Sequence, residues 1–415
     1  MKSSDSESTL KPCSADLPAP QNYFEQPSQA INDVTLDGLR SSDVIVAIPV
    51  QNEEHFIANC VLALACQPVA CRHGIVLLLN NCTDNTSTIV RNLVPGLPMP
   101  VLTINTTLPP PMANAGAARR LAMQYATQLA SPGSVLMTTD ADGQVSADWI
   151  AANLAAIRAG ADAVAGRAEL DSEDARQLPA RLREDDAREC EYDRLLDEIR
   201  ATLDPDPADP WPRHTEDSGA SIAVTLDAYF KVGGFPNVPM GEDRAFIAAL
   251  RRIDARIRHS LDVRVVVSGR IDGRAVGGMA DTIRRRLAKS DEVMDERFEP
   301  ARIAAQRAWI RGFFRRIWSA GRATPNAAAL LSRLSNEMGS EIEALLKSSY
   351  FGEAWVQLET RSPALRKSQV RVSELPNEMQ IAREILESVK RRIGVVTPAQ
   401  VNPADSPHFA AIEQP

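Results

Sequence analysis

The sequence predicts an α/β protein, with a mostly parallel sheet flanked by helices and an α-helical C-terminal extension. Two observations support this fold class. In the first half of the chain, short runs of Val, Ile and Leu alternate with stretches of helical character, which is typical of a parallel sheet covered on both faces. Beyond Gly278, helical patterning replaces this alternation.

Composition limits the classes of protein to consider. The chain has 415 residues, of which 44% are hydrophobic, so it can bury the core of one large domain or two. Its formal net charge of −8 argues against a nucleic-acid-binding protein. The six cysteines include no C-x-x-C pair, which indicates neither a zinc site nor a disulfide framework. Because neither a signal peptide nor an apolar membrane-spanning stretch is recognisable, we expect a cytoplasmic protein.

Four segments differ in character along the chain. Residues 1–42 are rich in Ser, Asp, Pro and Gln, so we expect a flexible N-terminal segment that buries too little apolar surface to fold alone. Residues 43–278 are predicted to form the α/β domain, and residues 279–394 the helical extension. Residues 395–415 contain Pro, Ala and Gln and are predicted to be a disordered tail.

Apolar runs predict the strands, and helical spacing of apolar residues predicts the helices. In 171–204, apolar residues from Tyr192 to Leu203 recur at helical spacing, and the segment "DPDPADPWP" ends that helix. The predicted strands are 44–50, 74–80, 100–105, 134–140, 161–166, 219–224 and 263–267. The predicted helices in the α/β domain are 54–66, 84–93, 114–129, 147–159, 171–204, 225–232 and 242–253.

Two carboxylates follow the fourth predicted strand, in "VLMTTDADGQV". In an extended backbone the side chains at i and i+2 point the same way, so Asp140 and Asp142 are expected to face a common ligand. Their oxygen atoms suit a divalent cation. A calcium-binding EF-hand loop is excluded, because it would need an acid at Thr138 and a glutamate at Trp149.

Polar or small residues also follow the first three strands, at the edge where a parallel sheet binds its ligands. These segments are "PVQNEE" (49–54), "NNCTDNT" (80–86) and "NAGAARR" (114–120). The second offers side chains that can hydrogen-bond a base or a ribose. The third opens a helix whose N–H groups, with Arg119 or Arg120, can face an anion. Capping and turns explain each segment alone, but their placement at successive strand ends favours a ligand site.

Together, "VIVAIPVQNEE", "LLLNNCTDNT", "NAGAARR", "LMTTDADGQVSADWI", "FKVGGFP" and "GEDRAF" resemble the family 2 glycosyltransferases with the GT-A fold, over about residues 43–278. The resemblance implies a Rossmann-like GT-A sheet. It also implies an enzyme that moves a sugar from a nucleoside diphosphate sugar to a hydroxyl acceptor. By the same resemblance, Asp140 and Asp142 hold Mg²⁺ or Mn²⁺ on the diphosphate, with Asp142 as the firmer metal ligand.

The resemblance further assigns residues that surround the nucleotide. Many relatives carry two acids after the second strand, where this chain has Asn80 and Asn81. An amide is neutral but can still hydrogen-bond a base, so the nucleotide preference stays open. The expected donor contacts are Pro49, Asn52, Glu53, Asn81, Asp84, Arg119 and Asp140.

"GEDRAF" places two acids at the start of a helix, where the resemblance puts the catalytic base of the family. We expect Asp243 to be the base, with Glu242 as the second candidate. A hydroxyl that attacks the anomeric carbon in one step must lose its proton, and a carboxylate opposite the leaving group can take it, with inversion. Three alternatives stay open: two acids that merely cap a helix, a soluble transferase similar to glucosyl-phosphoglycerate synthases that acts with retention, and a non-catalytic nucleotide-sugar-binding protein.

Other residues are candidates for the two ends of the site. Arg270 and Arg274 lie four residues apart among glycines, and they could bind a diphosphate. Gly219 allows close backbone approach on the acceptor side, and His214 lies nearby in the sequence.

Helix-forming residues 307–322 place Trp309, Ile310, Phe313, Phe314 and Ile317 on one side and four arginines on another. We expect the apolar side to pack on the catalytic domain or on a second subunit. The alternative is peripheral contact with an anionic membrane surface.

Overall fold

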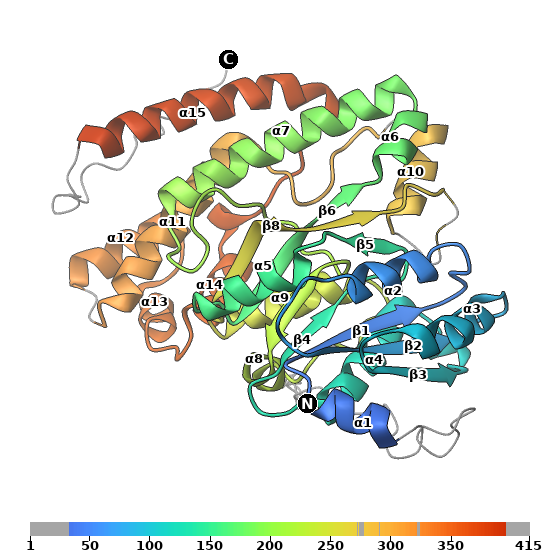
Figure 1. The fold of residues 1–415 in the computed structure, drawn as a ribbon. Helices are drawn as coiled ribbons and strands as arrows, with labels where there is room; N and C mark the ends of the chain where they lie inside the picture. The colour runs from blue at the N-terminus through green and yellow to red at the C-terminus, as the bar shows by residue number, and fades with distance from the viewer. Residues whose placement is uncertain (1–32, 272, 274–277, 290, 322–323, 396–415) are drawn as a thin grey trace, which may run out of the picture.

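The computed structural model describes residues 33–271, 273, 278–289, 291–321 and 324–395 (Figure 1). The predicted tail and most of the predicted N-terminal segment lie outside these residues, as do Arg274 and Arg322. Helix α1 (Asp33–Arg40) belongs to the segment predicted to be flexible. The difference has a packing reason, because Leu39 of this helix is fully buried against the sheet domain.

The described residues contain one eight-stranded sheet, in the order β3-β2-β1-β4-β7-β6-β8-β5. Strands β3, β2, β1 and β4 are parallel, β7 runs antiparallel to both β4 and β6, and β5 runs antiparallel to β8. The predicted fold class is therefore confirmed, with antiparallel strands at two positions. The strands are β1 (Val44–Val50), β2 (His73–Asn80), β3 (Val101–Thr106), β4 (Val135–Thr138), β5 (Gly143–Val145), β6 (Ala163–Leu170), β7 (Ile222–Thr225) and β8 (Ile257–Val267).

Two strand assignments differ from the prediction. Strand β5 was not predicted, because it has three residues and is defined by its pairing with β8 rather than by an apolar run. Strand β8 begins at Ile257, earlier than the predicted 263–267, because its first half pairs with β6 while carrying polar residues such as His259.

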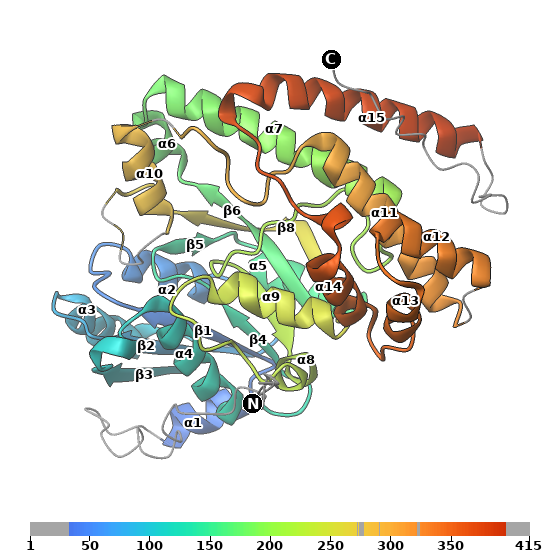
Figure 2. The same cartoon turned by 180° about the vertical axis from the view of Figure 1, so that it is seen from behind.

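Helices cover both faces of the sheet, as Figures 1 and 2 show from opposite sides. Alternate residues of β1 separate the two cores, since successive side chains of a strand point to opposite faces. Val44, Val46 and Ile48 pack with α2, α3 and α5, whereas Ile45 and Ala47 pack with α1, α4, α8 and α9. These helices are α2 (Ile57–Ala65), α3 (Thr86–Leu93), α4 (Ala115–Leu129), α5 (Trp149–Arg158), α8 (Leu226–Lys231) and α9 (Glu242–Arg252).

The remaining helices form the second part of the molecule. The predicted helix 171–204 is two helices, because Pro179 lacks an N–H group and restricts the residue before it. The longer of these, α7, lies alongside α15 and packs with α11 (Figure 1). The helices are α6 (Ser172–Gln177), α7 (Ala180–Leu203), α10 (Met279–Ala288), α11 (Ala301–Ser319), α12 (Pro325–Ser335), α13 (Gly339–Leu345), α14 (Phe351–Arg361) and α15 (Leu375–Val395).

The apolar side of α11 packs inside the protein. Ile310, Phe313, Phe314 and Ile317 are buried against α12, α13 and α14. On the basic side, Arg311 and Arg315 form ion pairs with the buried Asp204 at the end of α7, and Arg307 pairs with Glu299 and Glu359. The apolar side is therefore buried and does not form a membrane-contacting surface. It packs on other helices of the extension, rather than on the catalytic domain as expected. None of the described helices is long and apolar enough to span a membrane.

Helix α14 joins the extension to the sheet domain through a close backbone contact. The Asp254 carboxylate accepts hydrogen bonds from the N–H groups of Phe351 (2.6 Å) and Gly352 (2.7 Å). A Cβ added to Gly352 would lie 1.8 Å from the Arg251 carbonyl oxygen, so this position has no room for a side chain.

Gly352→Ala should therefore push α14 away from α9 and lower the free energy of unfolding by about 1–3 kcal/mol. Urea denaturation measures this change. The matched control is Gly339→Ala, because Gly339 is also helical but a Cβ there meets nothing within 4 Å. Equal stability of the two variants would contradict the contact.

Candidate functional site

One continuous cleft runs from the carboxyl ends of the sheet strands to the helical extension. Its volume is about 2790 Å³, which exceeds the roughly 300–1,000 Å³ of a site for one small ligand. The residues that line it include Pro49, Asn80 and Asp142 at or after the strand ends, the segment 215–220, and Asp243. The cleft therefore has room for two substrates.

Arg119 of α4 joins three segments of the site. Its side chain is 5% exposed, and it donates to Asp140 Oδ1 (2.5 Å), Glu242 Oε1 (3.0 Å), Thr138 Oγ1 (2.8 Å) and the Gly219 carbonyl (2.9 Å). Burial alone would lower the pKa of Arg119, but the ion pairs with Asp140 and Glu242 outweigh burial and raise the pKa. These bonds are all within the protein, and contact of Arg119 with the donor diphosphate stays a prediction.

Asp142 forms the second acidic position of the site. Arg270, which follows β8, lies 2.9 Å from Asp142 Oδ2 and also binds both carboxylate oxygens of Glu53, at 2.5 and 2.6 Å. Burial, and then repulsion by Asp140, raise the pKa of Asp142 to about 6, although Arg270 opposes this shift. The structure thus brings the predicted residues Glu53, Asp140, Asp142 and Arg270 together.

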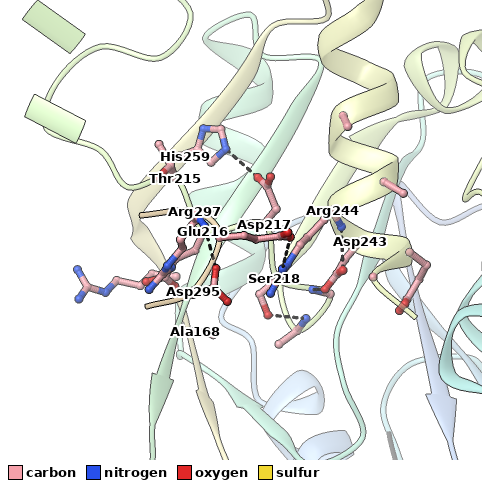
Figure 3. A pocket seen from close by; sticks show the side chains of 18 of the residues that line it. Ala168, Thr215, Glu216, Asp217, Ser218, Asp243, Arg244, His259, Asp295 and Arg297 are labelled. Atoms are coloured by element: carbon pink, nitrogen blue, oxygen red, sulfur yellow. Dashed lines mark hydrogen bonds and ion pairs between the residues drawn. The ribbon is translucent and has the colours of Figure 1, made fainter. Parts of the chain in front are cut away.

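Asp243 lies at the start of α9 and faces the cleft (Figure 3). Its Oδ2 accepts from the Gly219 N–H (2.8 Å) and its Oδ1 from the Arg244 N–H (2.8 Å). Burial, followed by the charge of Glu242, raises the pKa of Asp243. Glu242 is 5% exposed and is paired with Arg119, which favours Asp243 over Glu242 as the base.

Gly219 has no room for a side chain. A Cβ at this residue would lie 2.6 Å from Nη2 of Arg119, so glycine is needed for the approach of the arginine. Close approach of an acceptor to Gly219 stays a prediction. The N–H group of Gly219 binds Asp243 and its carbonyl binds Arg119. Gly219 therefore connects the two halves of the site.

Three residues expected near the nucleotide instead bind neighbouring loops. The Asn52 side chain accepts from the Thr83 N–H at 2.7 Å. Asn81 both donates to and accepts from the backbone of Leu108, at 3.1 and 3.0 Å. Asp84 accepts from the Glu54 and Thr86 N–H groups, at 3.1 and 3.0 Å. These side chains shape the loops after β1 and β2. Their contact with a base or ribose stays a prediction.

Asn80 was not among the predicted donor contacts. It lines the cleft and is 1% exposed, and neither polar atom of its amide has a hydrogen-bond partner among the described residues. A buried amide without a partner is costly, which points to a ligand partner. Strand alternation could have identified it, because Asn80 has the parity of Val76 and Leu78, which pack on the α4 side of the sheet.

The predicted acceptor-side histidine does not line the cleft. Nδ1 of His214 accepts from the Glu216 N–H at 3.1 Å, and burial followed by the nearby His259 lowers the pKa of His214 to about 4. His259 itself lines the cleft and was not predicted. Its Nδ1 lies 2.7 Å from Asp209. Its Nε2 lies 3.2 Å from Asp217, and Figure 3 shows these two side chains facing each other.

His259 carries a positive charge more readily than an ordinary histidine. Burial lowers its pKa, but hydrogen bonds to Asp209 and Asp217 outweigh burial and raise it. Arg251 binds Asp217 as well, at 2.9 and 3.0 Å. The segment before β7 is thus held in place at Asp217, two residues before Gly219, by the buried His259 and the exposed Arg251.

Asp140 and Asp142 can hold a divalent cation only together with other ligands. No group of three or more metal-ligating His, Cys, Asp or Glu side chains is found among the described residues. Mg²⁺ commonly binds one or two carboxylates and completes its coordination with substrate phosphates. The pair of aspartates therefore fits a cation that is shared with a diphosphate.

Comparisons with known proteins support part of the resemblance. Residues 45–208 match the family model described as Glycosyl transferase family 2, which confirms the predicted family for this segment. No curated protein matches the chain significantly.

Solved structures with a related arrangement include S. aureus TarS 1–349 in complex with UDP, at 15% identity, 84% coverage of this chain, 91% of that chain and a TM-score of 0.41. A second is mannosyltransferase PcManGT from Pyrobaculum calidifontis in complex with GDP-Man and Mn²⁺, at 15% identity, 90% and 92% coverage and a TM-score of 0.40. A third is glucosyl-3-phosphoglycerate synthase from Mycobacterium tuberculosis in complex with Mn²⁺, UDP and phosphoglyceric acid, at 13% identity, 64% and 84% coverage and a TM-score of 0.36.

The raised pKa of Asp142 predicts a pH dependence of stability. Between about pH 4 and 6, the folded protein binds a proton at Asp142 that the unfolded chain does not bind, so the free energy of unfolding falls as the pH rises. Asp142→Asn removes this contribution. The stability of wild type relative to Asp142→Asn should therefore fall by about 2 kcal/mol from pH 4 to pH 7.

Urea denaturation across this pH range measures the difference. Asp148→Asn is the control, because Asp148 is an exposed aspartate close in sequence. If the stability of wild type relative to Asp142→Asn instead increased with pH, the ion pair with Arg270 would dominate over burial.

Proposed function

We propose that the protein transfers a sugar from a nucleoside diphosphate sugar to a hydroxyl acceptor, with a divalent cation at Asp140 and Asp142. One observation carries this proposal: in a single cleft, Arg119 links the aspartate pair after β4 to the Asp243 region at the start of α9. The family match over residues 45–208 supports the reaction class. A cytoplasmic location remains part of the proposal.

The donor would occupy the end of the cleft at the strands β1, β2 and β4. Asn80 offers an amide donor and an acceptor to the nucleobase, next to Pro49. Asp142 and Asp140 would hold Mg²⁺ or Mn²⁺ on the diphosphate. When bound there, the cation stabilises negative charge on the leaving diphosphate.

The acceptor would occupy the middle of the cleft, next to Asp243. The carboxylate of Asp243 can accept the proton of the attacking hydroxyl, and its raised pKa makes it a stronger base than an ordinary aspartate. The Gly219 N–H holds Oδ2 in a fixed position, so the base is oriented before the acceptor binds. A base on the side opposite the leaving group gives inversion at the anomeric carbon.

A nucleotide-sugar-binding protein without catalysis is the second candidate. It shares the donor end of the cleft, but it gives no reason for a partly buried carboxylate that backbone N–H groups hold at the acceptor position. Turnover by wild type and by the Asp243 variant separates the two functions.

Asp243→Asn keeps the shape of the side chain and removes the base. We expect unchanged binding of the nucleotide sugar and a fall in turnover of roughly 10²–10⁴-fold, measured as release of nucleoside diphosphate. Asp227→Asn is the control, because Asp227 is an exposed acid in the first turn of α8. Turnover of Asp243→Asn equal to wild type would exclude Asp243 as the base.

Asn80→Ala should weaken binding of the preferred nucleotide by roughly tenfold, because the loss of a hydrogen bond to a buried partner costs about 1–2 kcal/mol. A thermal-shift screen of UDP- and GDP-sugars with and without Mn²⁺ identifies that nucleotide, since a ligand that binds the folded state raises the apparent stability. Asn85→Ala is the control, because the Asn85 amide binds Glu54 outside the cleft. Asp140→Ala should abolish the part of the shift that depends on Mn²⁺. Equal nucleotide binding by wild type and Asn80→Ala would contradict the base contact.

A further inference from the structure

Arg270 occupies the position beside Asp142 where a divalent cation is proposed to bind. Its Nη2 lies 2.9 Å from Asp142 Oδ2, and its two terminal nitrogens bind the two carboxylate oxygens of Glu53. The guanidinium also lies over the ring of Phe56, 5.1 Å from the centroid. Arg270 therefore supplies a positive charge to Asp142 from within the chain.

Glu53 anchors this arginine. The Glu53 side chain is 6% exposed, and its pair with Arg270 uses the planar fork of the guanidinium, which is the most specific geometry for a carboxylate. The backbone N–H of Glu53 is fixed in turn by Thr86 Oγ1 at 2.8 Å. Arg270 can therefore release Asp142 while it stays paired with Glu53. The buried carboxylate of Glu53 then keeps its partner.

A guanidinium and a divalent cation repel each other when both approach the same carboxylate. Binding of a cation at Asp142 therefore requires that Arg270 withdraw or that a second group with negative charge separate the two. A diphosphate is such a group, because its oxygens can bind the cation and the guanidinium at once.

We propose that Arg270 is an exchangeable internal cation, which neutralises Asp142 in the free protein and transfers to the diphosphate when donor and metal bind together. The identity of the diphosphate as a sugar donor rests on the proposed function. The exchange makes metal binding weak without nucleotide and couples it to nucleotide binding. By linkage, nucleotide and metal strengthen each other by the same factor.

Mn²⁺ titration of the full-length protein without nucleotide tests this exchange, with free Mn²⁺ measured by electron paramagnetic resonance. Arg270→Gln should bind Mn²⁺ about tenfold more tightly than wild type, because the competing charge is absent. Arg270→Lys should give a smaller gain, because one ammonium group cannot bridge Glu53 and Asp142 as a planar fork does. The double variant Arg270→Gln/Asp142→Asn should lose the gain, which places the bound Mn²⁺ at Asp142.

Arg194→Gln is the matched control. Arg194 also makes three short contacts with two carboxylates, Glu191 and Glu198, but it lies on α7 and does not line the cleft. Its Mn²⁺ affinity should equal that of wild type.

The same titrations in the presence of UDP and of GDP measure the coupling. With the nucleotide that binds, wild type should gain about tenfold or more in Mn²⁺ affinity, and Arg270→Gln should gain less.

Equal or weaker Mn²⁺ binding by both Arg270 variants without nucleotide would overturn the exchange. If neither nucleotide binds, the proposed donor is wrong, whereas the comparison without nucleotide still decides the role of Arg270. If Arg270→Gln does not fold, the comparison of Arg270→Lys with wild type decides it.

Discussion

The candidate site depends on the buried guanidinium of Arg119. Its four acceptors come from the end of β4, from the segment before β7 and from the first turn of α9. A buried cation is stable only if its charge is matched, and here Asp140 and Glu242 provide two carboxylates. Loss of one partner would leave an uncompensated buried charge, at a cost of about 3–5 kcal/mol. The ion pairs that stabilise the fold thus also set the distance between Asp140, at the proposed cation site, and Asp243, the proposed base.

Gly219 extends this constraint from the arginine to the base. Its carbonyl accepts from Arg119 and its N–H donates to Asp243, and no Cβ could fit between them. Two residues earlier, Asp217 is held by His259 and Arg251. The backbone that orients Asp243 is therefore fixed from both sides by charged hydrogen bonds, which keeps the carboxylate in place before any acceptor arrives.

The sequence was sufficient to predict the parallel core of the sheet and the position of the aspartate pair, because both follow from local patterns. Strand β5 could not be predicted, since its pairing partner β8 lies about 120 residues away in the sequence, and pairing at such a separation leaves no local signal.

The same limit applies to predicting what a side chain contacts. Asn81 and Asp84 have the residue types that bind a base, but whether an amide or carboxylate faces a ligand or a neighbouring loop depends on where that loop lies. His259 was missed because its partners, Asp209 and Asp217, lie 50 and 42 residues away.

The two aspartates of the pair differ in how they are bound, although they are separated by a single alanine. Asp140 is held by Arg119, whose side chain is 5% exposed and has partners on three segments, so moving this arginine would disrupt the core of the site. Asp142 is held by Arg270, whose side chain is 18% exposed and is anchored independently by Glu53. A cation that competes for Asp142 breaks one contact of the partly exposed Arg270. A cation that displaced Arg119 would break the contacts that hold three segments of the site together. Asp140 is therefore bound firmly into the fold while it also lines the cleft, and Asp142 is the acid that can exchange its protein partner for a ligand.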